Sequence, residues 1–470
     1  MTTNLIPNGN VTKPAEFCSM HVAYPFVGVA PSNLTLGNVR TLEYGSTVPG
    51  VAGTRWYNIE LTQGVYTWSA LDTFITYYRG LGATVSFQIF GTPSWYTSIT
   101  TNDSAGHTGG YAYPDLDTNL VATQAFVTAL ITRYNTSGGA WQIANPTLGK
   151  GIKILMPVNE PQFLNATFTG VATGTTALTI SNLQVGSTPI AAQMFLESSG
   201  AAISPGLHIV SGSGTSWTMN AAATFNETVT GVGTGSNNFW WGTQTQTVDF
   251  CNAVYLAAKA VDSTVEVTSP SFTNPVSYAQ PWLNTFGTQY PTVKGSSTFD
   301  TLDFHAYWVS AYGKPYATFT NDIIGGTCGV QAYQNLSALY CGGKPVSMSE
   351  FGFDATSTNN LISFLNETPL FRFTTLLQCM AASAALGLKR FGCFRYVNFG
   401  STDGTSALCG VFYVSGLTIN GVSYPVDANG VVLAFNTMAG VAGKTTTNPS
   451  FAQIGGLVNL TFTDSTQLVV

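Results

Sequence analysis

Short apolar runs rich in β-branched and aromatic residues alternate along the chain with segments of helical period. Eight such runs occur, at residues 17–24, 36–44, 84–91, 152–158, 265–272, 301–308, 345–352 and 390–399. Strands that are apolar throughout are typical of parallel sheets covered by helices on their faces. The pattern therefore predicts an α/β fold.

The segments between the runs carry apolar residues at i, i+3, i+4 and i+7, as at residues 71–78, 127–134 and 254–261. Eight strands alternating with such helices favour a parallel sheet closed as a (β/α)8 TIM barrel. We expect this barrel to span residues 17–164 and 238–442. A doubly wound open sheet is the alternative, but no GxGxxG follows the first predicted strand.

One segment breaks the alternation of strands and helices. Residues 165–237 hold only two formal charges, Glu197 and Glu227, and read as short strands separated by Gly, Thr and Ser. We expect a small all-β module inserted after strand 4 of the barrel. A hairpin-like stretch occurs at 410–426, within the predicted barrel span, and the edge-strand patterns of the final residues VNLTFTDSTQLVV predict a short β-rich C-terminal extension, residues 443–470.

The composition changes the picture of the surface rather than that of the core. Of 470 residues, 44% are hydrophobic and only 8% are charged, so the surface must be built from hydroxyl and amide side chains, which suits extracellular or virion proteins. A net charge of −6 with 16 Lys and Arg gives no electrostatic footprint for nucleic acid and no polybasic patch for a membrane. We expect neither partner.

The N-terminal stretch MTTNLIPNGNVTKPAEF lacks a basic region followed by an apolar core, so no secretory signal is expected. No apolar run approaches the length of a transmembrane helix. Either the chain is cytosolic or it leaves the cell by another route, such as lysis.

Seven cysteines are present, and none forms a CxxC pair. This spacing argues against a zinc or redox site, and we expect neither a metal nor a cofactor. Cys328 and Cys341 flank one helix-like segment. A bridge between them and two free thiols both remain open.

Two carboxylates stand in unusual places, in the stretches PVNEP and KPVSMSEFGF. Glu160 follows the fourth apolar run and Glu350 ends the seventh, although Glu is a poor strand residue and costly to bury. By the period of two, Glu160 is in phase with Val158, and Glu350 with Val346 and Met348. Both side chains are then expected to point into the barrel mouth, where the active sites of such barrels lie.

Two carboxylates facing each other are what glycoside hydrolysis requires. One must be protonated to donate to the leaving oxygen, and the other must be ionised to attack the anomeric carbon. The structural alternative is a pair of buried carboxylates neutralised by Lys or Arg, which the small number of basic residues disfavours.

The sixth run adds polar side chains to the same region. Asp303, His305 and Tyr307 share one face of the predicted strand, and His305 and Tyr307 are expected to bind the sugar or to orient the nucleophile. His305 could instead be a satisfied core histidine. Near the strand ends, His21 either binds substrate or packs, and aromatic faces suited to stacking on sugar rings are supplied by Trp95, Trp308 and Tyr396.

VNEP on strand four and SEFG on strand seven resemble the large barrel superfamily of retaining glycosidases. The stretches at 54–95 and 260–273 resemble glycoside hydrolase family 39 and its exopolysaccharide-cleaving relatives. The resemblance implies that Glu160 is the general acid/base and that Glu350 is the nucleophile. It also implies that Asn159 holds the substrate 2-hydroxyl.

The resemblance extends to three further positions in this chain. The family's strand-six His and Tyr map to His305 and Tyr307, and its strand-two Arg maps to Arg40. Arg40 could also serve only to tie strands together inside the barrel. This chain departs from the family at Val158, where an aromatic residue usually precedes the Asn-Glu pair.

The inserted segment resembles β modules that recur in bacteriophage tail proteins, through TFTGVATGTTALTI and SPGLHIVSGSGT. These features together predict a retaining endo-glycosidase that hydrolyses a bacterial surface polysaccharide, as a phage tail depolymerase located in the virion tail or outside the cell. Assembly as a homo-oligomer or within a virion is compatible with this prediction. The alternatives are a non-catalytic carbohydrate-binding or structural virion protein and a bacterial exoglycosidase acting on small glycosides.

Overall fold

A computed structural model gives the fold of the chain. It describes residues 2–3, 16–23, 35–43, 52–97, 112–161, 163–184, 190, 194–198, 203, 207–234, 244–273, 279–280, 282–283, 298–308, 329–353, 377, 379–393, 397–398, 412–413, 417–419, 422–424, 436–441, 443–452, 458–465 and 467–469.

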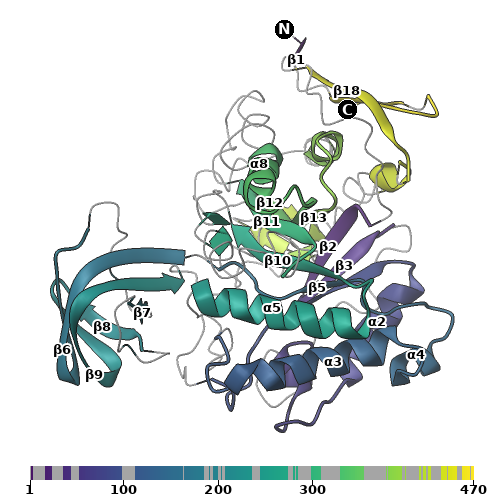
Figure 1. Ribbon diagram of the computed structural model, residues 1–470. Coiled ribbons are helices and arrows are strands. Elements are labelled where there is room, and N and C mark those ends of the chain that lie inside the picture. The colour runs from purple at the N-terminus through teal and green to yellow at the C-terminus, as the bar shows by residue number, and fades with distance from the viewer. Residues whose placement is uncertain are drawn as a thin grey trace.

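Eight parallel strands close into a barrel, in the order β10-β11-β12-β13-β2-β3-β4-β5 (Figure 1). The strands are β2 (Cys18–Ala23), β3 (Asn38–Glu43), β4 (Thr84–Gln88), β5 (Ile154–Met156), β10 (Glu266–Thr273), β11 (Thr301–Trp308), β12 (Val346–Phe353) and β13 (Phe391–Cys393). Each lies within or overlaps one of the eight apolar runs. The (β/α)8 TIM barrel predicted from the sequence is confirmed.

Helices cover the outside of the barrel. In the part of the chain that the structure describes, the longer helices include α2 (Ser69–Gly80), α3 (Val121–Asn135), α5 (Gln244–Val261) and α8 (Val330–Tyr340), and the short ones include α1 (Trp56–Ile59), η1 (Thr118–Leu120) and α4 (Ala140–Ala144). The first three coincide with the predicted helical periods, and α3 lies beside α5 (Figure 1). Within the described part of the chain, no helical segment has the length and hydrophobicity that a bilayer crossing needs.

Apolar and polar residues alternate along the barrel strands, with a different outcome on each face. On β11, Leu302 and Phe304 join the apolar layer under the helices, where Phe304 stacks on Tyr333 of α8 at 4.1 Å. Asp303 and His305, between and beyond them, are fully buried and turn inward. The barrel interior is thus lined largely by polar side chains.

Hydrogen bonds join these inner side chains in layers. At the amino ends of the strands, Glu266 is bound by Arg390, with Nη1 donating at 2.9 Å, and by Lys389 at 2.8 Å. At the start of β3, Asn38 Oδ1 accepts from the hydroxyls of Ser19 and Ser86, each at 2.8 Å. Among the described residues, these inner side chains line a cavity of about 10 Å³, a volume that holds roughly one water molecule, so this part of the interior is packed.

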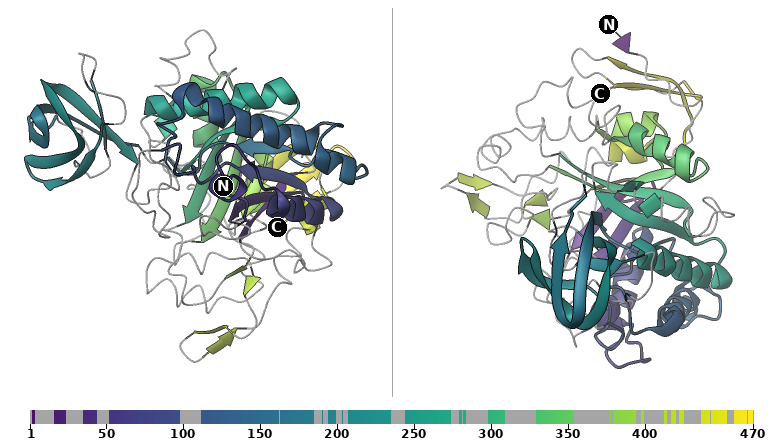
Figure 2. Two further views of the ribbon diagram at one scale, coloured as in Figure 1. Left: turned by 90° about the horizontal axis from the view of Figure 1, so that it is seen from below. Right: turned by 60° about the vertical axis from the view of Figure 1, so that its left-hand side comes forward.

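Residues of the predicted insertion form a separate antiparallel sheet. Its strands are β6 (Phe163–Ser181), β7 (Phe195–Glu197), β8 (Ile209–Ser213) and β9 (Ser216–Thr234). They enclose their own apolar core, which includes Phe168 and Ile209, and the sheet projects away from the barrel (Figures 1 and 2). The domain boundaries themselves remain a prediction.

The remaining strands lie near the two ends of the chain. A four-stranded sheet joins β1 (Thr2–Thr3) to β18 (Thr446–Ala452), β19 (Val458–Phe462) and β20 (Gln467–Val469), which brings the termini together (Figure 1). Two small pairs are β14 (Val397–Asn398) with β15 (Phe412–Tyr413), and the predicted hairpin of β16 (Leu417–Ile419) with β17 (Val422–Tyr424). Cys341 is a buried free thiol, and Cys328 lies outside the described residues.

Candidate active site

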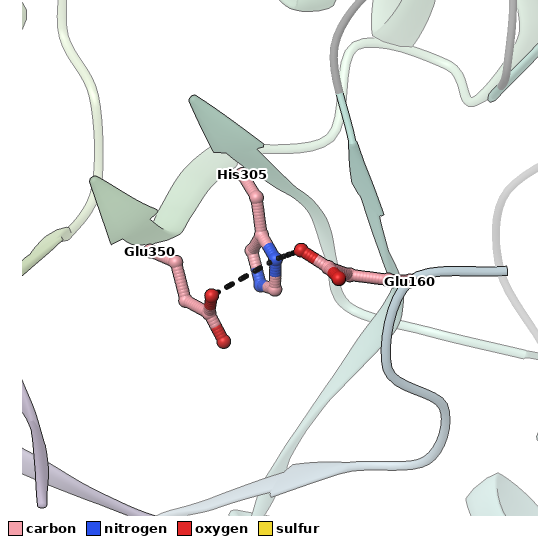
Figure 3. Close-up of side chains that lie close together, drawn as sticks. All are labelled: Glu160, His305 and Glu350. Atoms are coloured by element: carbon pink, nitrogen blue, oxygen red, sulfur yellow. Dashed lines mark hydrogen bonds and ion pairs between the residues drawn. The ribbon is translucent and has the colours of Figure 1, made fainter. Parts of the chain in front are cut away.

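Glu160 and Glu350 meet at the carboxyl ends of the barrel strands, with His305 between them (Figure 3). Glu160 follows β5, and Glu350 lies on β12, three strands further round the closed barrel. Their exposed fractions are 8% and 3%, and His305 is fully buried. The two carboxylates predicted from the sequence are therefore brought together.

Glu160 reaches this position through an irregular backbone rather than through strand periodicity. β5 ends at Met156, and Val158 packs into the outer apolar layer instead of facing inward. Ser271 of β10 then holds the chain, donating from its N–H to the Val158 carbonyl at 3.0 Å and accepting from the Glu160 N–H at 2.9 Å. The predicted phase of Glu160 with Val158 is wrong. A left-handed backbone at Glu160, with φ of 43°, turns the side chain inward instead.

Glu350 also reaches the interior through an irregularity. In the β11–β12 register, Phe304 pairs with Met348 and His305 pairs with Glu350, so two residues of β12 face one of β11. This is a β-bulge at Ser349. Val346 and Met348 belong to the outer apolar layer, so the predicted phase of Glu350 with them is also wrong. The bulge shifts the phase and turns Glu350 inward.

Arg40 of β3 links the two halves of the site. Its Nη1 donates to Glu350 Oε1, and its Nη2 donates to Asn159 Oδ1 and to Gln88 Oε1, the last at 2.9 Å. The sequence also allowed a purely structural role, in which buried carboxylates are neutralised by Lys or Arg, and such a pair with Arg is present at Glu350. The pair uses Oε1, and Oε2 lies 3.4 Å from His305 Nδ1. Arg40 therefore ties strands together and also contacts the catalytic candidate.

His305 contacts both carboxylates. Its Nδ1 lies 2.5 Å from Glu160 Oε1, and its Nε2 lies 3.0 Å from Ser349 Oγ and 3.3 Å from Arg40 Nη1. Burial lowers the pKa of His305 to about 4, with Glu350 and Asp303 opposing this shift and Arg40 adding to it. At neutral pH the imidazole is therefore uncharged.

The two glutamates occupy different electrostatic environments. Burial raises the pKa of Glu160 to about 7, although the Arg40 charge opposes this shift. Glu350 is held directly by the Arg40 guanidinium through a charge-assisted hydrogen bond. Glu160 is thus suited to carry a proton near neutral pH, whereas Glu350 is paired with a cation.

One oxygen of Glu160 lies within 4.8 Å of one oxygen of Glu350, and His305 offers a nitrogen within the same distance. Three such atoms could bridge a metal ion. The Arg40 guanidinium already lies against Glu350 and close to the His305 ring, so it would repel a second cation. The cluster fits proton transfer better than metal binding.

The other predicted site residues are placed unevenly. Asn159 lies in the site, where its Oδ1 accepts a hydrogen bond from Arg40 Nη2. Trp95 packs edge-on to Tyr96 at 6.2 Å against the outer core, and its described contacts do not include either glutamate. For the remaining four, the backbone is described without the side chain or the residue lies outside the described range: His21, Tyr307, Trp308 and Tyr396.

Sequence reasoning missed Ser349 and Gln88 as members of the site. Ser349 Oγ donates to Asp303 and contacts His305, and Gln88 fixes Arg40. The signal for Ser349 was available, because Ser347 and Ser349 alternate with apolar neighbours. That alternation indicates a polar inner face on β12.

Comparison with solved structures bears on the fold. A glucosidase from Croceicoccus marinus is similar over 98% of this chain and 74% of its own, with a TM-score of 0.53 and 12% identity. A monomeric beta-xylosidase from Caulobacter crescentus CB15 is similar over 96% of this chain and 74% of its own, with a TM-score of 0.52 and 12% identity. An enzyme of glycoside hydrolase family 39 from Xanthomonas axonopodis pv. citri is similar over 97% of this chain and 75% of its own, with a TM-score of 0.50 and 12% identity.

The fold is a TIM barrel shared with glycosidases. At 12% identity this likeness establishes the architecture and leaves the chemistry to the site itself. No protein-family model and no curated protein matches the sequence.

Proposed function

We propose that the chain is a retaining glycosidase in which Glu160 is the general acid/base and Glu350 the nucleophile. The observation that carries this proposal is the carboxyl pair, with oxygens within 4.8 Å of each other at the barrel mouth. Retaining enzymes hold their carboxyl groups about 5–5.5 Å apart, whereas inverting enzymes need about 6.5–9.5 Å to admit a water. The shared barrel fold of known glycosidases agrees with this reading.

The proposed reaction has two steps. In the first, the Glu350 carboxylate attacks the anomeric carbon, the glycosidic C–O bond breaks, and the Glu160 proton passes to the leaving oxygen. In the second, Glu160 takes a proton from water as that water attacks the same carbon and releases Glu350. Two inversions at one carbon give a product of retained configuration.

Asn159 is positioned to assist both steps. Arg40 binds its Oδ1, so the amide nitrogen is the group that can donate to the substrate. This agrees with the role that the family resemblance gives it, on the 2-hydroxyl of the sugar. The neighbouring Glu160 would then lie next to the scissile bond.

We further propose that the substrate is a bacterial surface polysaccharide, cleaved within the chain by a phage tail protein. Two features support this. The inserted sheet resembles phage tail modules in sequence, and its first strand β6 begins at Phe163, three residues after Glu160. Because β6 follows the proposed acid/base so closely along the chain, we infer that the sheet lies near the leaving-group side of the cleaved bond, where one arm of a polymer would continue.

Substitution of the two glutamates tests the assignment. We expect Glu350→Gln to abolish turnover of the polysaccharide, and we expect azide to restore part of the activity of Glu160→Ala with a product of retained configuration. Glu227→Gln, which removes a carboxylate from β9 in the inserted sheet, serves as the matched control. An inverted product from the unmodified protein, measured by NMR during hydrolysis, would contradict the mechanism.

The type of product separates the competing functions. An endo-acting enzyme shortens the polymer before small sugars accumulate, whereas an exoglycosidase releases small sugars first. Tight glycan binding without release of reducing ends would instead favour the non-catalytic virion protein.

A further inference from the structure

The hydroxyl of the bulge residue Ser349 lies between a buried carboxylate and the site histidine. Its Oγ donates to Asp303 Oδ2 and lies 3.0 Å from His305 Nε2. Asp303 is fully buried, and its other oxygen accepts from Ser347 Oγ at 2.6 Å. A chain of hydrogen bonds thus runs from Asp303 through Ser349 to His305, and from His305 Nδ1 to Glu160.

The number of protons in this chain fixes their positions. A serine hydroxyl has one proton to donate, and an ionised carboxylate can only accept. The Ser349 proton is therefore used on Asp303, and Ser349 Oγ can only accept from His305 Nε2. This places the ring proton of neutral His305 on Nε2 and leaves Nδ1 as an acceptor.

Arg40 and Glu350 are the competing influences on the ring. Arg40 Nη1 lies 3.3 Å from His305 Nε2 and would favour an unprotonated nitrogen there. Glu350 Oε2 lies 3.4 Å from Nδ1 and would favour a proton on that atom, although Glu160 Oε1 lies closer to Nδ1, at 2.5 Å. The same Nη1 already donates to Glu350, and the contact of Nε2 with Ser349 is shorter, at 3.0 Å. The negative charge of Asp303 behind Ser349 also favours a donor at Nε2.

We propose that Asp303 and Ser349 are positioning residues that hold His305 in the Nε2–H form, so that Nδ1 accepts the proton of Glu160. The resting site then keeps its acid protonated, with the proton on the carboxyl oxygen 2.5 Å from Nδ1. Substrate binding needs only to exchange Nδ1 for the glycosidic oxygen as the acceptor. The proposal rests on the acid/base role proposed above for Glu160, but its geometry can be tested without any substrate.

Nitrogen NMR of the full chain labelled with 15N-histidine reads the tautomer directly. The chain has four histidines, and the signals of His305 are those that His305→Gln removes. We expect a protonated Nε2 and an unprotonated Nδ1 at neutral pH. A protonated Nδ1 in the unmodified protein would overturn the proposal whether or not the chain cleaves polysaccharide.

Two variants test the origin of the tautomer, with one matched control. Ser349→Ala removes the acceptor, and in Asp303→Asn the new amide can donate to Ser349 Oγ and free its proton for Nε2. Each is expected to move the His305 proton to Nδ1. Ser347→Ala removes the other hydroxyl on Asp303 without touching His305, so it should leave the tautomer on Nε2. If the folded variants keep the Nε2–H form, the proposal is wrong.

Activity gives a second readout if hydrolysis is observed. In Ser349→Ala, Glu160 loses its hydrogen-bond acceptor and is expected to ionise more easily. We therefore expect the alkaline limb of the kcat/KM profile to move about one pH unit lower, a shift whose free energy is about that of one hydrogen bond. Ser347→Ala should leave that limb in place. An equal loss of rate at every pH in Ser349→Ala would indicate a merely structural role.

Discussion

Glu160 combines two unfavourable features in one residue, a buried carboxyl group and a left-handed backbone. Left-handed conformations cost non-glycine residues about 1–2 kcal/mol, and a buried carboxyl group resists ionisation. Contacts with Ser271 and His305 hold the residue in this state. Strain kept at one position is what a site under functional constraint shows.

A pH dependence of activity follows from the acid role proposed for Glu160. Its pKa is raised to about 7 by burial, so the fraction of protonated acid falls as the pH rises through that value. We expect kcat/KM on the polysaccharide to fall about tenfold per pH unit on the alkaline side of about pH 7. A profile that stays flat to pH 9 would contradict the assignment.

Stability should respond to the same group. Because the folded pKa of Glu160 is raised from 4.5 to about 7, its stabilising contribution is complete below about pH 4.5 and is lost as the pH rises to about 7. Glu160→Gln imitates the protonated form and does not titrate. At pH 8 we expect its free energy of unfolding to exceed that of the unmodified protein by roughly 1–3 kcal/mol, which raises the unfolding temperature. At pH 4 we expect the two proteins to unfold at similar temperatures. Thermal unfolding at the two pH values measures the difference.

At the scale of single residues, the sequence predicted which side chains meet and not how they meet. Glu160, Glu350, His305, Arg40 and Asn159 were all named from motifs and polar faces, and the structure brings them together. Their hydrogen-bond partners depend on distances of a few tenths of an ångström, which no residue pattern encodes. The structure also leaves the predicted sugar-stacking aromatics untested, apart from Trp95.

At the scale of elements, the bulge in β12 depends on a close backbone contact with β13. A Cβ at Gly392 would lie 3.0 Å from Ser349 Cα and closer still to the Ser349 carbonyl oxygen. Only glycine leaves room for the bulge that turns Glu350 inward. Gly392 is therefore as necessary to the site as the side chains that form it.

Gly392→Ala is expected to destabilise the protein by about 1–3 kcal/mol, as overpacking does, and to remove most activity by displacing Glu350. Urea unfolding and turnover of the polysaccharide measure the two effects. Gly80→Ala, at the end of α2 where an added Cβ meets nothing within 4 Å, is the matched control and should be neutral or slightly stabilising. Equal behaviour of the two variants would show that the bulge is dispensable.

The strands themselves were predictable, but their phase near the site was not. All eight runs became barrel strands, because apolar length and alternation with helices report burial. Periodicity of two failed at Val158 and again at Met348, since a bulge and a left-handed residue each shift the alternation by one. Such irregularities concentrate beside active sites, where simple patterns are least reliable.

At the scale of the whole molecule, the inserted sheet and the barrel have separate apolar cores. The first residue of β6, Phe163, and the last residue of β9, Thr234, are register partners in that sheet. The two ends of the segment are therefore adjacent in space. A segment with such ends can be removed without stretching the chain that remains.

Replacing residues 164–233 with a short Gly-Ser turn should leave a folded barrel. We expect the unfolding temperature of the shortened chain to change by only a few degrees, since its core is intact. Cleavage of the long polymer should fall while turnover of short fragments is kept. The same deletion with Glu350→Gln controls for residual activity. Loss of the cooperative unfolding transition would show that the sheet is part of one folding unit.

The polar lining of the barrel has a consequence for how the chain tolerates change. At outer positions such as Phe304, apolar swaps of similar volume cost less than about 1.5 kcal/mol. At inner positions such as Asn38 and Arg390, truncating the side chain leaves a buried partner without its hydrogen bond, which lowers the free energy of unfolding by about 1–3 kcal/mol. In a library of random variants, the hydrophilic residues of the barrel strands would be depleted before the hydrophobic ones. Tolerance to substitution would alternate from one residue to the next along each strand. The least mutable positions would be polar residues, the type that composition alone assigns to the surface.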